Sequence, residues 1–335
     1  MDELTEEAIT RALIKVTREK SKTIHFTTGH GERNLNSTPQ EVEGASDLKK
    51  ELTDASYVVQ ELKLFESAAI PTDVQVLAIL GPQKPFLDSE IKLIRDFAIK
   101  GGKLFMAVDP GTQQNLAPLM AEMGIDYQNN FIVDLFGQIV GVGASVALGV
   151  AYSKTSEVTK KFNNMMSLFP LATALKPVAT ADVTAEEIVS TGPSSFTVKE
   201  LTKTVKGAPE NRGPHVVAMV VKGKGGTNAA TPPAKGAKPE PLHFSDQFQA
   251  VVFGDSDFLT NQFLYQQLNR DLALNGFAQL NQDSDIISIR PKKLEATPFN
   301  LPEQSFRIFA LGFLLLLPIA MFSMGGFIWY RRKNA

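Results

Sequence analysis

The chain has 335 residues, of which 43% are hydrophobic and 21% are charged, and this composition excludes an intrinsically disordered chain and allows two domains. Its formal net charge is -2, which excludes nucleic-acid binding by bulk positive charge. It contains no cysteine and no G-x-x-x-x-G-K-[ST] motif, so disulfides, thiol chemistry and nucleotide hydrolysis by a P-loop mechanism are excluded as well.

The first 130 residues alternate between helical and strand patterns. Apolar residues at helical spacing predict helices over residues 5–19, 46–55, 88–100 and 114–123, the second of them capped by Ser46. Short apolar or β-branched runs predict strands over residues 23–27, 57–64, 74–80 and 103–108. This order predicts an α/β fold with a mostly parallel sheet and helices on both faces, and residues 1–130 form its first part.

The pattern changes in the middle of the chain and then returns. Residues 131–241 are predicted to form a β-rich excursion, which contains an apolar run over residues 131–150 and strands over residues 194–205 and 215–222. A low-complexity stretch with four lysines predicts a flexible loop over residues 222–241. Residues 242–295 are predicted to close the α/β domain with a strand over residues 249–253 and a helix over residues 261–276.

Polar loops follow four of the predicted strands. They are Thr28-Gly-His-Gly-Glu32, Gly81-Pro-Gln-Lys-Pro85, Asp109-Pro-Gly-Thr112 and the segment that begins at Gly254-Asp255. The carboxyl ends of parallel strands share one edge of a sheet, where open α/β sheets place their ligands. The sequence therefore predicts a binding edge that carries Thr28, His30, Glu32, Lys84, Asp109 and Asp255. The alternative is that these residues only close turns and cap helices, with His30 exposed to solvent.

The same loops hold the candidates for chemistry. His30 and Glu32 are suited to act as acid and base, and the carboxylates of Asp109, Asp255 and Asp257 are suited to a divalent cation. Asp255 and Asp257 are equally suited to cap the helix that follows them. Because no nucleophile has a recognisable spacing from His30, the sequence assigns no catalytic residue, no metal site and no cofactor.

The last thirty residues predict a membrane anchor. Residues 308–330 are 23 residues without a charge, enough for a helix to cross a bilayer core of about 30 Å. Residues 296–307 are then a juxtamembrane linker and residues 331–335 a basic tail. Basic and aromatic residues that suit membrane interfaces flank the predicted span, namely Arg307, Trp329, Arg331, Arg332 and Lys333.

The positive-inside rule orients this predicted span. The basic tail places the C-terminus in the cytoplasm and the large domain on the outer side of the inner (cytoplasmic) membrane. A translocated domain needs a targeting signal, and residues 1–20 have no apolar core of the signal-peptide type. We therefore expect the chain to be a fragment whose N-terminal anchor is missing, and the alternative is a tail-anchored protein that faces the cytoplasm.

Several motifs together resemble one known family. The chain is similar to the auxiliary component of GldG-type ABC transport systems in Ala12-Leu-Ile-Lys-Val-Thr-Arg18, Phe26-Thr-Thr-Gly-His-Gly-Glu32, Leu80-Gly-Pro-Gln-Lys-Pro85, Gly102-Lys-Leu-Phe-Met-Ala-Val-Asp-Pro110, Gly254-Asp-Ser-Asp-Phe-Leu-Thr-Asn261 and Asp285-Ile-Ile-Ser-Ile-Arg-Pro291. The resemblance implies an extracytoplasmic domain with a class I glutamine-amidotransferase-like sheet. It also implies a role beside an ABC-2-type permease and a separate ATPase, in gliding motility or in an uncharacterised transport process.

Two classes of function remain open at this point. The first is a non-catalytic, membrane-anchored subunit whose domain binds substrate or partner proteins. The second is an extracytoplasmic hydrolase that uses His30, Glu32 and the aspartates. Amidotransferase chemistry is excluded because it needs a cysteine nucleophile, and a shared fold does not carry a shared reaction.

Overall fold

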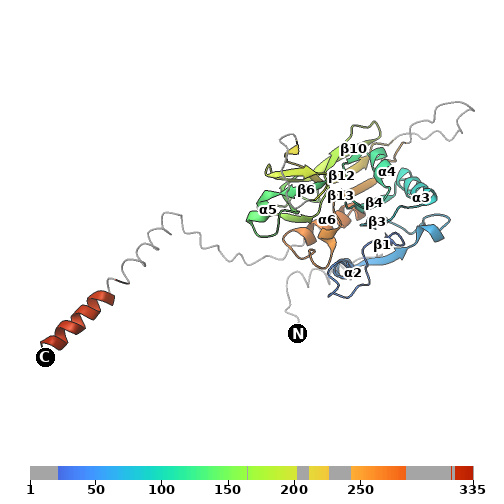
Figure 1. The fold of residues 1–335 in the computed structure, drawn as a ribbon. Helices are drawn as coiled ribbons and strands as arrows, with labels where there is room; N and C mark the ends of the chain where they lie inside the picture. Colours follow the sequence, from blue (N-terminus) through green and yellow to red (C-terminus); the bar gives the residue numbers. More distant parts are fainter. Residues whose placement is uncertain are drawn as a thin grey trace, which may run out of the picture. The chain divides into compact units, whose positions relative to one another are not determined.

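A computed structural model of the chain describes residues 22–163, 165–201, 211–225, 243–283, 318 and 321–334. The chain divides into two compact units, residues 1–290 and residues 291–335, which are described separately. The first unit contains every labelled helix and strand (Figure 1). The predicted helix over residues 5–19 lies outside the described residues.

The first unit alternates helices and strands in its first half and is rich in strands in its second half. The first half comprises β1 (Lys22–Thr27), α2 (Ser46–Asp54), β2 (Tyr57–Leu62), the short 3-10 helix η1 (Leu64–Glu66), β3 (Val76–Leu80), α3 (Asp88–Ile99), β4 (Lys103–Ala107) and α4 (Ala117–Glu122). The second half comprises β5 (Ile125–Tyr127), β6 (Phe131–Asp134), α5 (Leu135–Ile139), β7 (Val146–Tyr152), β8 (Ser167–Pro170), β9 (Leu175–Pro177), β10 (Val183–Thr191), β11 (Ser195–Val198), β12 (Val216–Gly223), β13 (Gln249–Phe253), the 3-10 helix η3 (Asp257–Leu259) and α6 (Asn269–Asn281).

The described strands form one large mixed sheet and one small ribbon. In the large sheet the order is β2-β1-β3-β4-β13-β12-β10-β7-β8, and β5 and β9 lie off this path. The pairs from β2 to β13 are parallel, and those from β13 to β8 are antiparallel. The expected α/β class is confirmed, and the sheet is mixed because the strands of residues 131–241 extend it with antiparallel pairs.

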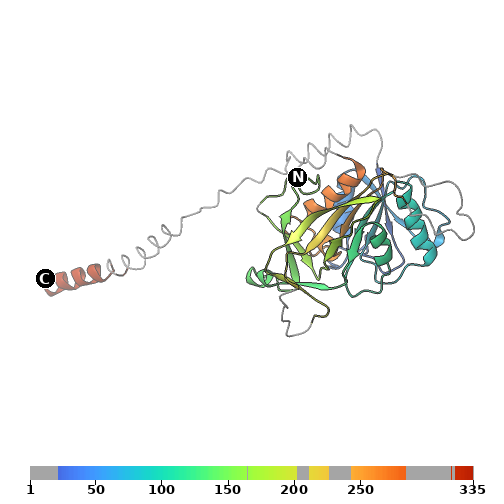
Figure 2. The ribbon, with the colours of Figure 1, turned by 90° about the horizontal axis from the view of Figure 1, so that it is seen from above.

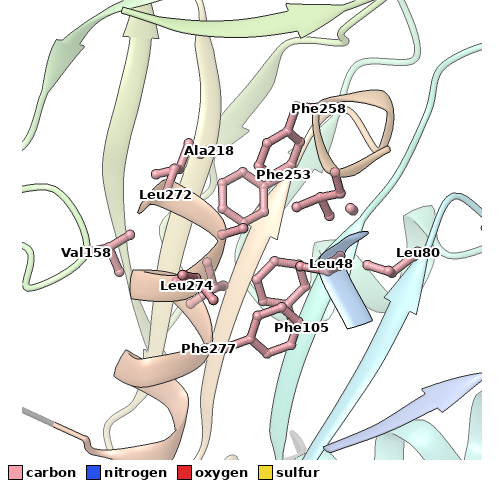
Figure 3. Packing of buried hydrophobic residues seen from close by; sticks show 14 of the residues in the cluster. Leu48, Leu80, Phe105, Val158, Ala218, Phe253, Phe258, Leu272, Leu274 and Phe277 are labelled. Carbon is pink, nitrogen blue, oxygen red and sulfur yellow. The ribbon is translucent and has the colours of Figure 1, made fainter. Parts of the chain in front are cut away.

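Alternate residues of the parallel strands point to opposite faces, so that helices cover both faces of the sheet. On one face, Phe105 of β4 packs with α2 and α6, and its ring stacks on that of Phe277 with centroids 4.0 Å apart (Figure 3). On the other face, Leu104 and Met106 pack with buried residues of α3 and α4. Figure 2 shows α6 (orange) and the helices α3 and α4 (teal) separated by the strands. This burial of both faces explains the near-continuous apolar runs of β3 and β4.

The last helix of the unit differs from its prediction. The pattern predicts a helix over residues 261–276, whereas α6 begins at Asn269 and ends at Asn281. Residues 261–268 form turns instead. Gly276 does not end the helix, because it is the point at which α6 approaches the sheet: a Cβ atom there would lie 3.0 Å from Cε2 of Phe105. The glycine therefore allows close packing and is not a stop signal.

The middle of the chain also differs in detail. Residues 131–150 are not one β-rich run, because Asp134 caps the short helix α5 by accepting a hydrogen bond from the Phe136 N–H. The strand predicted over residues 194–205 is confined to β11 among the described residues, and residues 202–210 lie outside them. The predicted loop over residues 222–241 begins with the end of β12, and residues 226–241 lie outside the described part.

The second unit is described over a short helix only. Residues 321–333 are helical, and large apolar side chains stand exposed on it, including Phe322 (82% exposed) and Met321 (69% exposed). Among the described residues, no helix is both long and apolar enough to cross a membrane. Residues 308–317, 319 and 320 of the predicted span, and Arg307 before it, lie outside the described residues.

The two ends of the described part of the first unit meet at the amino edge of its sheet. Nζ of Lys22, the first residue of β1, lies 2.7 Å from Oδ1 of Asp283, just after α6. The Tyr57 hydroxyl of β2 donates to the other carboxylate oxygen of Asp283, at 2.8 Å. The described part of the domain therefore begins and ends at the same place, at the edge opposite the carboxyl ends of the strands.

Candidate functional site

The loops after β1, β3, β4 and β13 come together at the carboxyl edge of the sheet. The backbone N–H groups of Gln83 and Lys84 both donate to the carbonyl of His30, at 2.8 and 2.9 Å. The Gly81 N–H donates to the carbonyl of Ala107, at 2.8 Å. Side chains of the β4 and β13 loops are joined as well, because the Ser256 hydroxyl donates to Asp109 Oδ2 at 2.6 Å. This edge of the sheet is the candidate site.

One arginine gathers the acidic side chains of this edge. Nη2 of Arg33 lies 3.2 Å from Asp109 Oδ2 and 2.5 Å from Asp257 Oδ1, and its Nε donates to the Ser256 hydroxyl at 2.9 Å. Asp109 also accepts from the Ser256 N–H. We call these four residues, with Asp255 beside them, the Arg33 cluster. Since Asp109, Asp255 and Ser256 are buried, the cluster links three loops inside the protein.

The charges of this cluster shift one another's protonation. Burial lowers the pKa of Arg33, but the charges of Asp109, Asp257 and Asp255 more than offset this effect, and the net shift is upward. Burial, with the nearby charges of Asp257 and Asp109, raises the pKa of Asp255 well above its usual range. Burial also raises the pKa of Asp257 to about 6, against the opposing charge of Arg33. One guanidinium thus faces three carboxyl groups, and folding favours the protonated form of two of them.

Asp255 has the capping role considered for it. Its two carboxylate oxygens accept hydrogen bonds from the N–H groups of Asp257 and Phe258, at 2.8 and 3.1 Å, at the start of η3. Asp257, by contrast, points its carboxylate at Arg33. No group of three or more acidic or histidine side chains suited to hold a metal ion is present among the described residues.

His30 lies in a separate, closed polar cluster, and the alternative that places it in solvent is wrong. Its ring is buried and stacks on Phe86, with centroids 4.1 Å apart. Nε2 lies 3.0 Å from Oε2 of Glu90 in α3, and Nδ1 lies 3.5 Å from Oε1 of Glu32. Glu90 is fully buried and accepts from the Leu87 N–H at 2.7 Å. The cluster therefore fastens the loop after β1 to the first turn of α3.

A cleft opens beside these two clusters. Its volume is about 800 Å³, and it is lined by residues after β1, by residues 40–44, by Gln83, by Leu171 and by Asp257. Of the lining side chains that carry charge, Glu32, Glu41, Glu43 and Asp257 are acidic and Arg33 is basic. The exposed Val42 and Leu171 add an apolar part to the wall. The cleft is thus mixed in character and mainly acidic, and Arg33 and Asp257 connect it to the buried cluster.

The residues of the predicted binding edge fall into different environments. Asp109 and Asp255 belong to the Arg33 cluster, while His30 and Glu32 belong to the cluster with Glu90. Lys84 is exposed, and Thr28 is half-buried and donates its N–H to the Leu62 carbonyl at 3.1 Å. Whether this edge binds a ligand or a partner stays a prediction.

Two residues at the centre of the site are absent from the sequence-based set. Arg33 follows the Thr28-Gly-His-Gly-Glu32 motif directly. Its position at the end of a strand-end loop was the one sequence feature that could have placed it at the site. Glu90 is the third residue of α3, where a carboxylate can accept from the N–H of the residue before the helix, here Leu87. Its contact with His30 joins residues sixty positions apart, which no local pattern indicates.

The Arg33 cluster predicts how stability depends on pH. Because folding raises the pKa of Asp257 from 3.8 to about 6, its contribution to stability is fully present below pH 3.8 and is lost as the pH rises through about 6. Asp257→Asn cannot ionise, and we expect it to flatten this part of the melting temperature profile. Thermal denaturation at several pH values between about 4 and 7 measures the effect. Asp54→Asn, at an exposed ion pair, is the control. An unchanged slope in Asp257→Asn contradicts the assignment.

Asn261 gives a second prediction, because it caps α2 from a distant segment. Ser46 does not supply the expected cap; Oδ1 of Asn261 accepts from the Asp47 N–H at 3.0 Å. Its Nδ2 donates to the carbonyls of Thr38 and Glu41, at 3.2 and 3.0 Å, in the segment that lines the cleft. We expect Asn261→Ala to cost about 2 kcal/mol of unfolding free energy.

Hydrogen exchange separates the two roles of Asn261. Asn261→Asp keeps the acceptor for the Asp47 N–H and loses the donors to the two carbonyls. We therefore expect it to leave the first-turn amides of α2 protected and to increase exchange only in residues 37–44. Equal exchange in both segments for the two variants contradicts this division.

The chain matches a known protein family over most of its length. A family model described as "ABC-type uncharacterized transport system" matches residues 21–287. No curated protein matches the chain in sequence.

Among solved structures, the mmIFT52 N-terminal domain is similar with a TM-score of 0.53 and 18% identity, over 77% of this chain and 97% of that chain. At this identity the likeness shows the fold alone. A ThuA-like protein from Bacteroides uniformis gives a TM-score of 0.42 and 14% identity, over 78% and 93% of the two chains. A β-galactosidase from Rahnella gives 0.41 and 10%, over 80% and 32%.

Proposed function

The chain belongs to the family of the ABC-type uncharacterized transport system, and from this premise we propose that it is a non-catalytic, membrane-anchored auxiliary subunit of an ABC-2-type transporter. The observation that carries the proposal is the family match, which covers residues 21–287 and so includes both clusters and the cleft. The partners are the permease and the ATPase subunit, in gliding motility or in another export process. The domain binds substrate or partner proteins outside the inner membrane.

The C-terminal residues support the anchor in this proposal. In the described helix of residues 321–333, Phe322, Phe327 and Ile328 are at least half exposed, as are Met321 and Met324. A helix that is apolar all round is stable only when an apolar medium covers it. The uncharged run of residues 308–330 and the basic residues after it suit a bilayer with the C-terminus in the cytoplasm.

The cleft is the place where the domain binds its partner or substrate. It lies at the carboxyl edge of the sheet, where α/β folds hold ligands, while the described part of the domain begins and ends at the opposite edge. Its mixed charges suit recognition. A hydrolase is not favoured, because both ring nitrogens of His30 face glutamates and the Ser256 hydroxyl donates to Asp109, not to a histidine.

The anchor and its orientation are tested by single-cysteine labelling, because the chain has no cysteine of its own. Cysteines are introduced one at a time at Lys63 in the domain and at Asn334 after the basic residues. In sealed cells, a membrane-impermeant maleimide is expected to label position 63 from outside and position 334 only after lysis. Labelling of position 334 from outside would show that the orientation is wrong.

The cleft is tested with charge reversals at exposed positions. Substitutions at His30 or Glu32 would disturb a buried cluster, so Glu43→Lys and Lys84→Glu are the informative variants. We expect both to impair transporter function, or recovery of the permease by co-purification, without lowering the melting temperature. Lys154→Glu, away from the cleft lining, is the control. Glu43 lines the cleft and Lys84 follows Gln83 of its lining, so normal function in both variants would leave the two clusters with a structural role only.

A further inference from the structure

A short surface segment between β6 and β7 exposes a group of large apolar side chains. Helix α5 and the three residues after it, residues 135–142, are called the apolar tip here. Five of its eight residues have large apolar side chains that are at least 37% exposed: Leu135 (49%), Phe136 (42%), Ile139 (78%), Val140 (41%) and Val142 (37%). Single exposed apolar residues are ordinary on a protein surface, but a contiguous group marks an interaction site.

The apolar tip protrudes from the domain. Gly141 and Gly143 have positive φ angles of 86° and 99°, and a Cβ atom added at either would meet nothing within 4 Å. Figure 1 shows α5 at the periphery of the domain. The chain carries no charge from Leu135 to Ser145, before the buried start of β7, which is unusual for a protruding surface segment. Open space and the lack of charge together indicate a segment built to enter an apolar environment.

Hydrogen bonds at its base hold the apolar tip in a defined conformation. Asp134 is buried, accepts from the Phe136 N–H at 3.0 Å and from the Ser194 hydroxyl at 2.9 Å, and so fixes the start of α5. The N–H groups of Val142 and Gly143 both donate to the Gly137 carbonyl, which closes the turn. A preorganised apolar segment loses little conformational freedom when it is buried, which favours binding.

We propose that the apolar tip inserts into the interfacial region of the lipid bilayer in which the chain is anchored. This inference rests on the anchor in the proposed function. The sequence between the end of the described domain and the predicted span, residues 284–307, is 24 residues and reaches at most about 80 Å. This linker therefore keeps the domain within about 80 Å of the bilayer that holds the predicted span, close enough for the domain to contact the bilayer. Protein-binding patches are enriched in arginine, tyrosine and tryptophan, whereas the tip has none of these residues and Gln138 is its one polar side chain.

Insertion of the apolar tip has a consequence for the cleft. Ser145, three residues after the tip, accepts a hydrogen bond at 2.9 Å from the N–H of Leu171, which lines the cleft. A domain that rests on its tip therefore holds this part of the cleft near the membrane surface. The described domain ends at Asp283, at the opposite edge of the sheet. The maximum reach of residues 284–307 is several times the roughly 20 Å length of a six-residue strand, so the linker is long enough to let the cleft edge face the membrane. A permease in the same bilayer would then meet the cleft directly.

The proposal is tested with the full chain reconstituted in vesicles of phosphatidylethanolamine and phosphatidylglycerol, with one environment-sensitive NBD label per variant. The labels are placed at Ile139→Cys in the tip, at Val178→Cys as an exposed apolar control in another loop, and at Ile328→Cys to report the anchor. We expect the label at position 139 to shift to the blue and to lose emission when doxyl-labelled lipids are included. The label at position 178 is expected to do neither.

The outcomes separate the inference from the function on which it rests. Quenching at position 328 without quenching at position 139 keeps the anchor and overturns the inference. A blue shift at position 139 without quenching by lipid means that a second copy of the chain covers the tip, which also overturns it. No quenching at either position rejects both. Ile139→Asp, with the label moved to Val142→Cys, is expected to abolish the quenching, and a label that stays quenched contradicts insertion through Ile139.

Discussion

Replacing Gly81 with alanine is expected to destabilise the domain by about 3 to 5 kcal/mol, a loss of roughly 10 °C in melting temperature. Gly81 has a φ angle of 60°, which favours glycine. A Cβ atom at this position would lie 2.3 Å from the Ser256 hydroxyl oxygen and 3.0 Å from Asp109 Oδ2. Moving the serine would break its hydrogen bonds with Asp109 and Arg33 in a buried site. Urea denaturation of the purified chain measures the effect.

Gly141→Ala is the matched control for this prediction. Gly141 also has a positive φ angle, 86°, but a Cβ atom there meets nothing within 4 Å. It therefore carries the backbone strain without the collision, and we expect a cost of about 1 kcal/mol. Equal losses for the two variants would mean that backbone conformation alone matters at Gly81. A loss below about 1 kcal/mol for Gly81→Ala would contradict the packing between the loops.

Replacing Arg33 with methionine is expected to cost about 3 to 5 kcal/mol at neutral pH, because it leaves the carboxyl groups of the Arg33 cluster buried without a cation. The Arg33 side chain is 16% exposed, and the side chains of its partners Asp109 and Asp257 are 12% and 22% exposed, so solvent screens the pairs only partly. We expect the loss to shrink as the pH falls, since protonation neutralises the same carboxylates. Unfolding free energies of the variant and the unchanged chain, at neutral pH and near pH 5, measure both effects.

Arg95→Met is the control for Arg33. Arg95 makes two hydrogen bonds to the carboxylate of Glu122, at 2.7 and 2.8 Å, but the pair is 27% and 35% exposed. A pair so open to solvent contributes little, and we expect a cost below about 1 kcal/mol with no pH dependence of this kind. Similar costs for the two variants, or a loss at Arg33 that does not change with pH, would contradict the role given to the cluster.

These expectations divide the carboxyl edge of the sheet into two layers. Gly81, Arg33 and the buried aspartates hold the loops together, and their substitution is expected to lower stability. Glu43, Lys84 and Val42 are exposed at or near the cleft and contribute little to that framework. Substitution in the outer layer is therefore the informative test of transporter function, and loss of function in the inner layer is ambiguous without a stability measurement.

The sequence by itself determined the parts of the protein that depend on local pattern. Apolar runs and helical spacing predicted β1, β3, β4 and β13 and the helices α2 and α3 to within a few residues, because strands buried on both faces leave a continuous apolar signal. The family resemblance, which rests on several motifs in order, agrees with the family model over residues 21–287. The uncharged run of residues 308–330 predicted a span that stays a prediction.

Only the tertiary structure decided which side chains meet. Arg33 contacts Asp257, Asn261 caps α2 and His30 contacts Glu90, and each of these pairs is far apart in the sequence. Burial of His30 was missed for the same reason, since its cover comes from Phe86 and α3. Gly276 suggested a helix end and proved to be a point of close packing, because the ring of Phe105 lies against it. Local propensity is read from neighbours in the chain, whereas burial, ion pairing and close approach depend on neighbours in space.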